Sequence, residues 1–212
     1  MTLSGLRRKS RVWTQALARI MFTPHLPRRA ASILDTSMQP YPAHLVQRLA
    51  LRDGSAVTVR PIRPEDARIE QDFVRNLSGE SRYYRFMDSV RELSPGMLQH
   101  FIQVDYVRHM ALIAVSERDG AEVQVGVARY VVDQSGLTCE FSIVIADEWQ
   151  RKGLGERLMR LLMDTARLAG VRWMYGEVLA GNQRMLKLTA KLNFAAHFDP
   201  IDPRMMRVEI AL

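Results

Sequence analysis

Three apolar segments separated by two short polar turns constrain the fold of this chain more than any other feature. The segments run from Met110 to Val115, from Val123 to Val132 and from Leu137 to Ile145. Arg118 to Gly120 separates the first two, and Asp133 to Gly136 separates the last two. Turns this short join antiparallel neighbours, because a parallel pair needs a crossover of about a dozen residues or more. The sequence therefore predicts two hairpins that form an antiparallel meander.

A strand and three helices are predicted before this meander. The strand runs from Val57 to Ile62. Pro64 to Asp66 is typical of a first helical turn, because proline loses no hydrogen bond there and acids face the positive end of the helix dipole. That helix is predicted to end near Asn76. A second helix is predicted around Ser81 to Phe86, and a third is predicted to begin at Ser94 with Pro95.

An amphipathic helix follows the meander, and its apolar face is predicted to contain Leu154, Leu158, Leu161, Leu162, Thr165 and Ala169. Gly170 is placed to end it. A strand from Trp173 to Leu179, a helix from about Asn182 to Leu192 and a closing strand from Met206 to Leu212 complete the chain. This order of elements predicts a mixed α/β fold with a mostly antiparallel central sheet flanked by helices.

Positive charge is concentrated at the start of the chain. Residues 1–50 contain eight Lys and Arg against one acid, Asp35, whereas the remaining 22 basic residues are balanced by 22 acidic ones. Four prolines interrupt any regular period between residues 23 and 42. We therefore predict a basic flexible extension over residues 1–40 and a neutral domain over residues 41–212. Attachment to a surface or partner is one hypothesis for the extension, and plain disorder and an organelle-targeting peptide are the alternatives.

The cysteine count and the hydropathy pattern indicate a cytoplasmic protein. Cys139 is the only cysteine, so no internal disulfide can form. No segment approaches the roughly 20 apolar residues of a membrane-spanning helix, and Gln15 and Arg19 interrupt the apolar stretch near the start of the chain. No histidines or cysteines have the spacing of metal ligands, so no metal is expected.

A loop with two glycines, Gln150 to Gly155, precedes the amphipathic helix. Backbone N–H groups at a helix start have no partner within the helix, and glycines let them approach a diphosphate closely. The loop is not a P-loop, because Lys152 precedes the second glycine and no Ser or Thr follows. Nucleotide hydrolysis is therefore not predicted, and by itself the loop is also compatible with a plain helix start.

The residues around this loop resemble the acetyl-CoA signature of the GNAT N-acetyltransferase family. Gln150 to Gly155 matches the form Gln/Arg-x-x-Gly-x-Gly/Ala, and Glu140 to Ile145 matches the strand before it. Val178 to Phe194 resembles the second cofactor segment of the family, with Asn193 where a glycine is usual. Asparagine tolerates the left-handed conformation that glycine would adopt there. The resemblance covers roughly residues 41–212 and implies the GNAT acyl-CoA N-acyltransferase fold with acetyl-CoA as cosubstrate.

The segment from Leu51 to Phe86 resembles a narrower group, the bacterial protein-lysine acetyltransferases that modify acyl-CoA synthetases. This resemblance implies that the acceptor is a lysine side chain of a metabolic enzyme. Two other functions remain open. One is acetylation of small-molecule amines, and the other is a non-catalytic protein that retains the fold and binds nucleic acid or a membrane surface through its basic extension, although no specific nucleic acid is expected.

Glu140 is the candidate general base. Removing a proton at pH 7 from a lysine ammonium with a pKa of about 10.4 costs roughly 4.6 kcal/mol, so acetyl transfer to an amine needs a base. Glu140 is a charged residue in an otherwise apolar strand, and it matches the catalytic glutamate of the lysine acetyltransferases. An outward-facing strand glutamate is the alternative interpretation.

The resemblance also implies which residues bind the two substrates. Backbone N–H groups near Val144 would polarise the thioester carbonyl and pair with the pantetheine arm. Asn182 would bind that arm, although helix capping explains it equally well. Tyr83 and Asp105 are candidates for the acceptor side, and Thr189 stands where many family members have a tyrosine acid. The predicted cofactor-binding residues are Ile143, Val144, Ile145, Gln150, Arg151, Lys152, Gly153, Leu154, Gly155 and Asn182.

Overall fold

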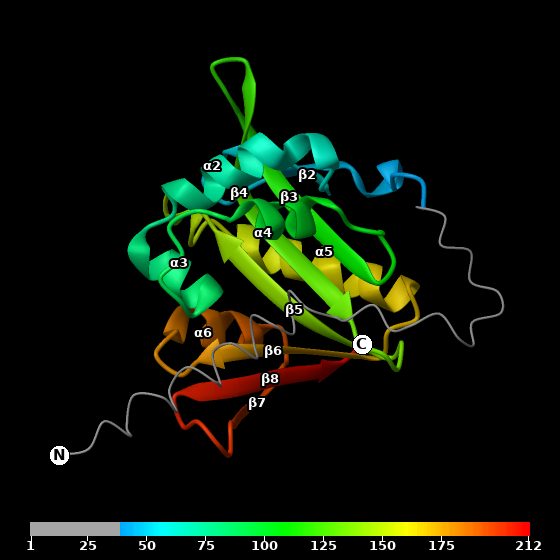
Figure 1. The fold of residues 1–212 in the computed structure, drawn as a ribbon, viewed down its shortest axis with the longest axis vertical. Coiled ribbons are helices and arrows are strands. Elements are labelled where there is room, and N and C mark those ends of the chain that lie inside the picture. Colours follow the sequence, from blue (N-terminus) through cyan, green and yellow to red (C-terminus); the bar gives the residue numbers. More distant parts are fainter. Residues whose placement is uncertain (1–38) are drawn as a thin grey trace.

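An eight-stranded sheet forms the centre of the computed structural model, which describes residues 39–212 (Figure 1). The strands are β1 (Gln47–Ala50), β2 (Ala56–Pro61), β3 (His109–Arg118), β4 (Ala121–Val132), β5 (Thr138–Ile145), β6 (Trp173–Leu179), β7 (Ala195–Phe198) and β8 (Met205–Ala211). Their spatial order is β1-β2-β3-β4-β5-β6-β8-β7. Only β5 and β6 pair in parallel, so the sheet is mostly antiparallel, as predicted. Residues 1–38, which hold nearly all of the predicted extension, lie outside the described residues.

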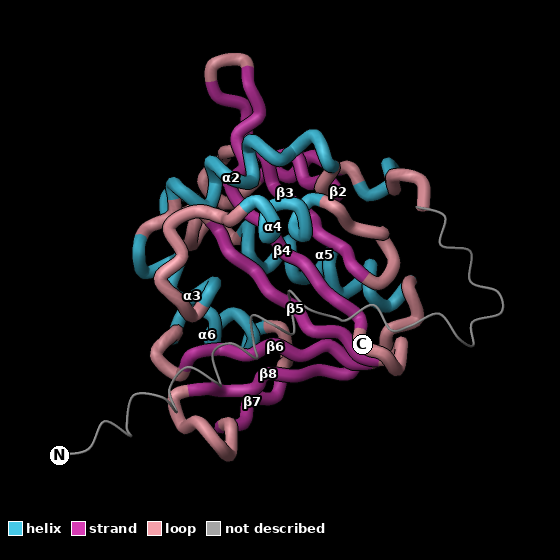
Figure 2. The backbone as a smooth tube through the Cα atoms, viewed as in Figure 1, coloured by secondary structure: helices cyan, strands magenta, loops and turns pink. Residues whose placement is uncertain are grey.

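Helices cover the two faces of this sheet in two groups (Figures 1 and 2). One face carries α2 (Ala67–Asn76), α3 (Gly79–Phe86) and α4 (Pro95–Ile102). The other face carries α5 (Leu154–Leu168) and α6 (Gln183–Lys191). Three short 3-10 helices, η1 (Ala43–Leu45), η2 (Pro64–Asp66) and η3 (Asp147–Trp149), complete the regular structure of the described part.

Most predicted element boundaries are confirmed. Ser94 caps α4 by accepting a hydrogen bond from the Met97 N–H at 3.3 Å, and Asn193 adopts the left-handed conformation with a φ of 66°. The predicted strand from Trp173 to Leu179 is β6 without change. The short strands β1 and β7 were not predicted.

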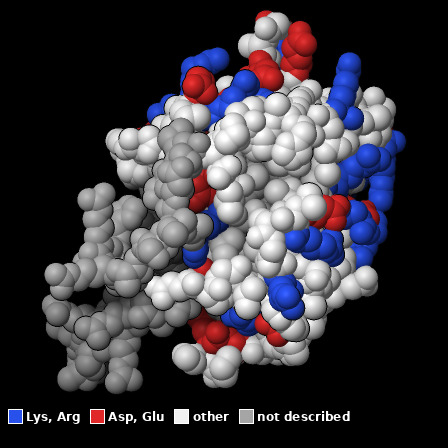
Figure 3. Space-filling view, turned by 90° about the vertical axis from the view of Figure 1, so that its right-hand side faces the viewer, with Lys and Arg blue, Asp and Glu red and all other residues white. Residues whose placement is uncertain are grey.

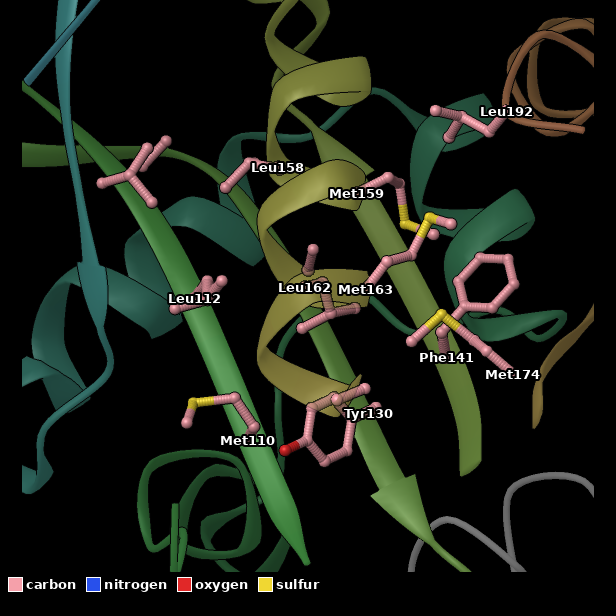
Figure 4. Packing of buried hydrophobic residues seen from close by; sticks show 14 of the residues in the cluster. Met110, Leu112, Tyr130, Phe141, Leu158, Met159, Leu162, Met163, Met174 and Leu192 are labelled. Atoms are coloured by element: carbon pink, nitrogen blue, oxygen red, sulfur yellow. The ribbon is translucent and has the colours of Figure 1, made fainter. Parts of the chain in front are cut away.

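The apolar face of α5 is wider than the sequence pattern suggested. Met159, Met163 and Ala166 are buried, whereas the predicted Leu161 is only partly buried and Ala169 is exposed. In Figure 4, Met159 and Met163 lie on the side of α5 nearer Phe141, and Leu158 lies on the side nearer Leu112. All of them belong to one buried cluster between α5 and the sheet. Burial of each large side chain contributes about 1.5–3 kcal/mol, so this contact fixes the position of α5 and of the loop before it.

The strands β5 and β6 separate after a short paired region. Thr138 to Glu140 pairs with Trp173 to Tyr175, and no pairing continues beyond Glu140. The Phe141 ring lies against Gly176, where an added Cβ would come within 2.7 Å of the ring, so only glycine fits there. The second halves of the two strands therefore border an open slot in the sheet.

Candidate active site

A cavity of about 580 Å³ occupies this slot. Its walls come from both diverging strands, from α3, from the loop before α5 and from α6. Glu140, Gly176, Gly153 and Asn182 all line it, although they are far apart in the sequence. The volume lies within the roughly 300–1,000 Å³ that is typical of small-molecule sites.

The loop before α5 presents backbone N–H groups to one end of the cavity. Gly153 is the N-cap of α5 with a φ of 90°, and no side chain caps the helix. Arg151 is also left-handed, with a φ of 62°. Gly155 lies in the first turn of α5 and lines the cavity, so N–H groups without an intrahelical partner lie at this end. Such an arrangement suits a phosphate group.

Two of the predicted cofactor residues have their side chains elsewhere. The Lys152 Nζ lies 2.9 Å from an Asp53 carboxylate oxygen and 4.8 Å from the centre of the Trp149 ring. Leu154, the first residue of α5, is completely buried in the core. Neither residue lines the cavity, so the expected contact of these two residues with the cofactor stays a prediction.

Gln150 connects the loop to two helices. Its amide nitrogen donates to the Ser81 Oγ at 3.2 Å and to the Ile145 carbonyl at 3.1 Å. Its amide oxygen accepts from the Arg184 Nη1 at 3.0 Å. Because Ser81 belongs to α3 and Arg184 to α6, Gln150 fixes both helices relative to the loop.

Asp147 holds the start of α3 against the same loop. Its carboxylate accepts from the Ser78 N–H at 2.9 Å, the Ser78 hydroxyl at 2.8 Å and the Ser81 hydroxyl at 2.7 Å. Partial burial would raise the pKa of Asp147, but these hydrogen bonds outweigh it and lower the pKa below its ordinary value of 3.8.

We expect Asp147→Asn to lower the free energy of unfolding by about 1 kcal/mol at pH 7, because an amide cannot accept all of these hydrogen bonds. A pKa that is lower in the folded than in the unfolded protein stabilises the fold above the unfolded value, and the contribution is lost as the pH falls through the folded value. Denaturant unfolding should therefore show a constant difference from wild type down to about pH 5 that shrinks below about pH 4. Asp119→Asn, in an exposed turn, is the control. A difference that persists unchanged at pH 3 would contradict this role.

Asn182 caps α6 and lines the cavity. Its Oδ1 accepts from the Met185 N–H at 3.1 Å. The capping role considered from the sequence is therefore present. The side-chain amide group at the cavity wall still has donors for a ligand, so a part in cofactor binding stays a prediction.

Glu140 lies on the face of β5 that is directed toward α3. Its neighbours Cys139 and Phe141 are buried on the α5 side, whereas Glu140 is half-buried and lines the cavity. The Tyr175 hydroxyl donates to its Oε2 at 3.3 Å. Burial and then the adjacent Glu140 carboxylate raise the pKa of Tyr175 to about 12, so the phenol keeps its proton at neutral pH.

Arg85 also lines the cavity, although it was not among the predicted site residues. Its guanidinium lies 5.1 Å from the centre of the Phe86 ring and 5.5 Å from that of Phe101. Burial and the nearby Arg129 lower its pKa to about 10, which leaves it charged at neutral pH near Glu140. The sequence does not distinguish Arg85 from its neighbours in α3, because a charged or aromatic residue stands at most positions of that helix. Tyr175 could be found only from its register opposite Glu140.

The acceptor-side predictions have mixed support. Tyr83 is exposed and does not line the cavity, although its neighbours Tyr84 and Arg85 do. The Asp105 Oδ1 accepts from the N–H groups of three residues that follow it, at 2.8–2.9 Å, and so shapes the turn before β3. Asp105 does not line the cavity, and its expected part on the acceptor side stays a prediction. Thr189 is buried in α6 and lies outside the cavity lining.

The split sheet, the carboxylate in the slot and the uncapped helix start agree with the acyl-CoA-dependent acyltransferase fold that the sequence resemblance implies. Residues 72–194 match the acetyltransferase (GNAT) family. The chain belongs to this family, whose members use acetyl-CoA, and it is an acetyltransferase.

The similarity extends to individual relatives. An acetyltransferase of Pseudomonas aeruginosa is 37% identical over 163 residues, which are 77% of this chain and 88% of the relative. The acetyltransferase Pat of Mycolicibacterium smegmatis is 29% identical over 143 residues, which are 67% of this chain but 42% of that relative. The crystal structure of the GNAT domain of S. lividans PAT superimposes with a TM-score of 0.74 at 28% identity, covering 82% of this chain and all of that domain.

The charged surface and the remaining side chains of the described residues bear on other kinds of site. Figure 3 shows Lys and Arg side chains gathered toward the right-hand side of that view, although basic and acidic residues are balanced beyond residue 50. Within residues 39–212, no group of three or more His, Cys, Asp and Glu is arranged to hold a metal ion. None of the helices in this part of the chain is long and apolar enough to cross a membrane.

Proposed function

We propose that this chain transfers acetyl groups from acetyl-CoA to lysine side chains of proteins, with Glu140 as the general base. The observation that carries the proposal is the position of Glu140 in the slot, beside a sheet face that no described helix covers at β6, β8 and β7 (Figure 1). A folded protein can bring a lysine to such an open face, whereas a small amine needs an enclosed pocket. The segment Leu51 to Phe86, which resembles the protein-lysine acetyltransferases, supplies β2, α2 and α3.

The residues of the cavity fit acetyl-CoA. The N–H groups at Gly153 and Gly155 suit its diphosphate, and the unpaired edge of β5 suits a pantetheine arm that pairs like a strand. Acetyl-CoA supplies an activated thioester carbonyl.

Proton transfer is the part of the reaction that we assign to Glu140. Glu140 takes one proton from the lysine ammonium, directly or through water, and the freed nitrogen bonds to the carbonyl carbon. The C–S bond breaks and the sulfur leaves with the electron pair. The second nitrogen proton neutralises the thiolate. Tyr175 holds the Glu140 carboxylate in place through its hydrogen bond.

A competition between acceptors tests the proposed substrate. The full chain is given acetyl-CoA with an acyl-CoA synthetase and, separately, with polyamines, amino acids and aminoglycosides. We expect the protein acceptor to have the highest kcat/KM, and mass spectrometry should locate the acetyl group on lysine. A small amine that is acetylated far faster than every protein would instead assign the enzyme to metabolite acetylation.

A further inference from the structure

Three cations from two parts of the chain meet at the end of the cavity beside the first turn of α5. Arg52 comes from the loop between β1 and β2, and Lys187 and Lys191 come from α6. All three line the cavity, and Glu156 of α5 lies among them. We refer to Arg52, Lys187 and Lys191 as the basic rim.

Glu156 fixes two members of the basic rim. Its Oε2 lies 2.6 Å from the Lys191 Nζ and 3.5 Å from the Arg52 Nη2. The Arg52 side chain also passes over the N-cap of α5, since a Cβ added to Gly153 would lie 3.3 Å from its Nε. Arg52 and Lys191 therefore approach the first turn of α5 from different elements and are held there by one carboxylate.

Lys187 adds a charge that the protein does not neutralise. It lies four residues before Lys191, so both side chains project from the same face of α6. Lys187 is exposed at the cavity and has no ion-pair or hydrogen-bond partner among residues 39–212. The basic rim thus carries three positive charges against the single carboxylate of Glu156.

We propose that the basic rim, through Lys187 and Lys191 above all, binds the 3′-phosphate of CoA, an inference that rests on the proposed use of acetyl-CoA. In the proposed binding mode, backbone N–H groups at the start of α5 bind the diphosphate. A phosphomonoester carries a charge of about −1.5 to −2 near pH 7, which matches side-chain cations that lie just beyond those groups. Lysine suits this task because its ammonium is a compact point charge. The basic rim therefore selects acetyl donors that carry this phosphate.

Calorimetry with CoA and 3′-dephospho-CoA tests the proposal on the full chain without an acceptor. We expect CoA to bind wild type roughly 10- to 100-fold more tightly, the range for hydrogen bonds to charged groups. In Lys187→Ala with Lys191→Ala this ratio should fall toward one, while the affinity for 3′-dephospho-CoA stays unchanged. Arg167→Gln is the matched control, because Arg167 pairs with Asp164 at the other end of α5. The ratio of kcat/KM for the two acetylated donors should follow the ratio of affinities.

The possible outcomes separate this inference from the proposed function. If wild type bound CoA and 3′-dephospho-CoA equally well, the inference would be overturned. It would also be overturned if the double variant lost the same affinity for both ligands, because the lysines would then act on the diphosphate. If wild type bound neither ligand, the use of acetyl-CoA would itself be wrong, and the inference would fall with it.

Discussion

Glu140→Gln is expected to lower kcat by roughly 100-fold or more at pH 7, the range for removal of a general base. The amide keeps the size of the side chain and still accepts the Tyr175 hydrogen bond, but it cannot take a proton from the acceptor ammonium. Acetyl-CoA affinity should change little. Raising the pH should restore part of the lost rate, because more of the acceptor is then already deprotonated. Steady-state kinetics between pH 7 and pH 10, with calorimetry for acetyl-CoA, measures each of these effects.

Glu148→Gln is the matched control for this experiment. Glu148 is an exposed carboxylate shortly after β5 that pairs with Arg118 at 3.9 Å and does not line the cavity. Its variant should retain wild-type kinetics. Wild-type turnover by Glu140→Gln at pH 7 would exclude Glu140 as the base and favour the interpretation of an outward-facing strand residue.

Gly155→Val is expected to weaken acetyl-CoA binding by roughly 30-fold or more, the effect of losing one or two hydrogen bonds to a charged phosphate. A Cβ at this position would lie 3.4 Å from the Leu188 Cδ2 and 3.8 Å from the Ile145 Cγ1, contacts that the fold can accommodate. The two further methyl groups of valine would occupy cavity space beside the N–H groups of α5. Calorimetry measures the affinity, and thermal unfolding without ligand confirms that the fold is retained.

Gly96→Val provides the same substitution in an equivalent helical position. Gly96 is the second residue of α4, as Gly155 is of α5, and no atom lies within 4 Å of an added Cβ there. Both variants place valine at the second position of a helix, so any effect of helix propensity is the same in the two proteins. Only Gly155→Val should change the affinity for acetyl-CoA. If a folded Gly155→Val protein bound acetyl-CoA with unchanged affinity, this end of the cavity would not be part of the binding site.

Much of the fold was predictable because the relevant signals are local. The turns at Arg118 to Gly120 and Asp133 to Gly136 determine the meander, and the caps at Pro64 and Ser94 determine where helices begin. The strands β1 and β7 were missed because each has four residues and little apolar pattern, and β7 is exposed along its whole length. Such strands form because a neighbouring edge is available, which a single stretch of sequence does not reveal.

The candidate site was predicted where segments of the chain resemble the family's cofactor-binding segments, which include Asn182 as well as the loop before α5. The loop before α5 and Glu140 are adjacent in the sequence, so their pattern could be recognised together. Arg52, Arg85 and Lys187 reach the same cavity from separate elements, and only the folded structure brings them together. The structure shows that the Asp105 carboxylate shapes its own turn, and its expected part in binding the acceptor stays a prediction.

The narrow junction between β5 and β6 also has a mechanical consequence. The part formed by β6, β8 and β7 is joined to the rest of the sheet through three residue pairs, whereas β6 and β8 share seven. Segments joined by few hydrogen bonds can open as separate cooperative units at a lower free energy than global unfolding. In the proposed binding mode, acetyl-CoA in the slot would contact both parts and pair with the free edge of β5. We therefore expect its binding to join the two parts of the sheet more firmly and to raise the free energy at which they open separately.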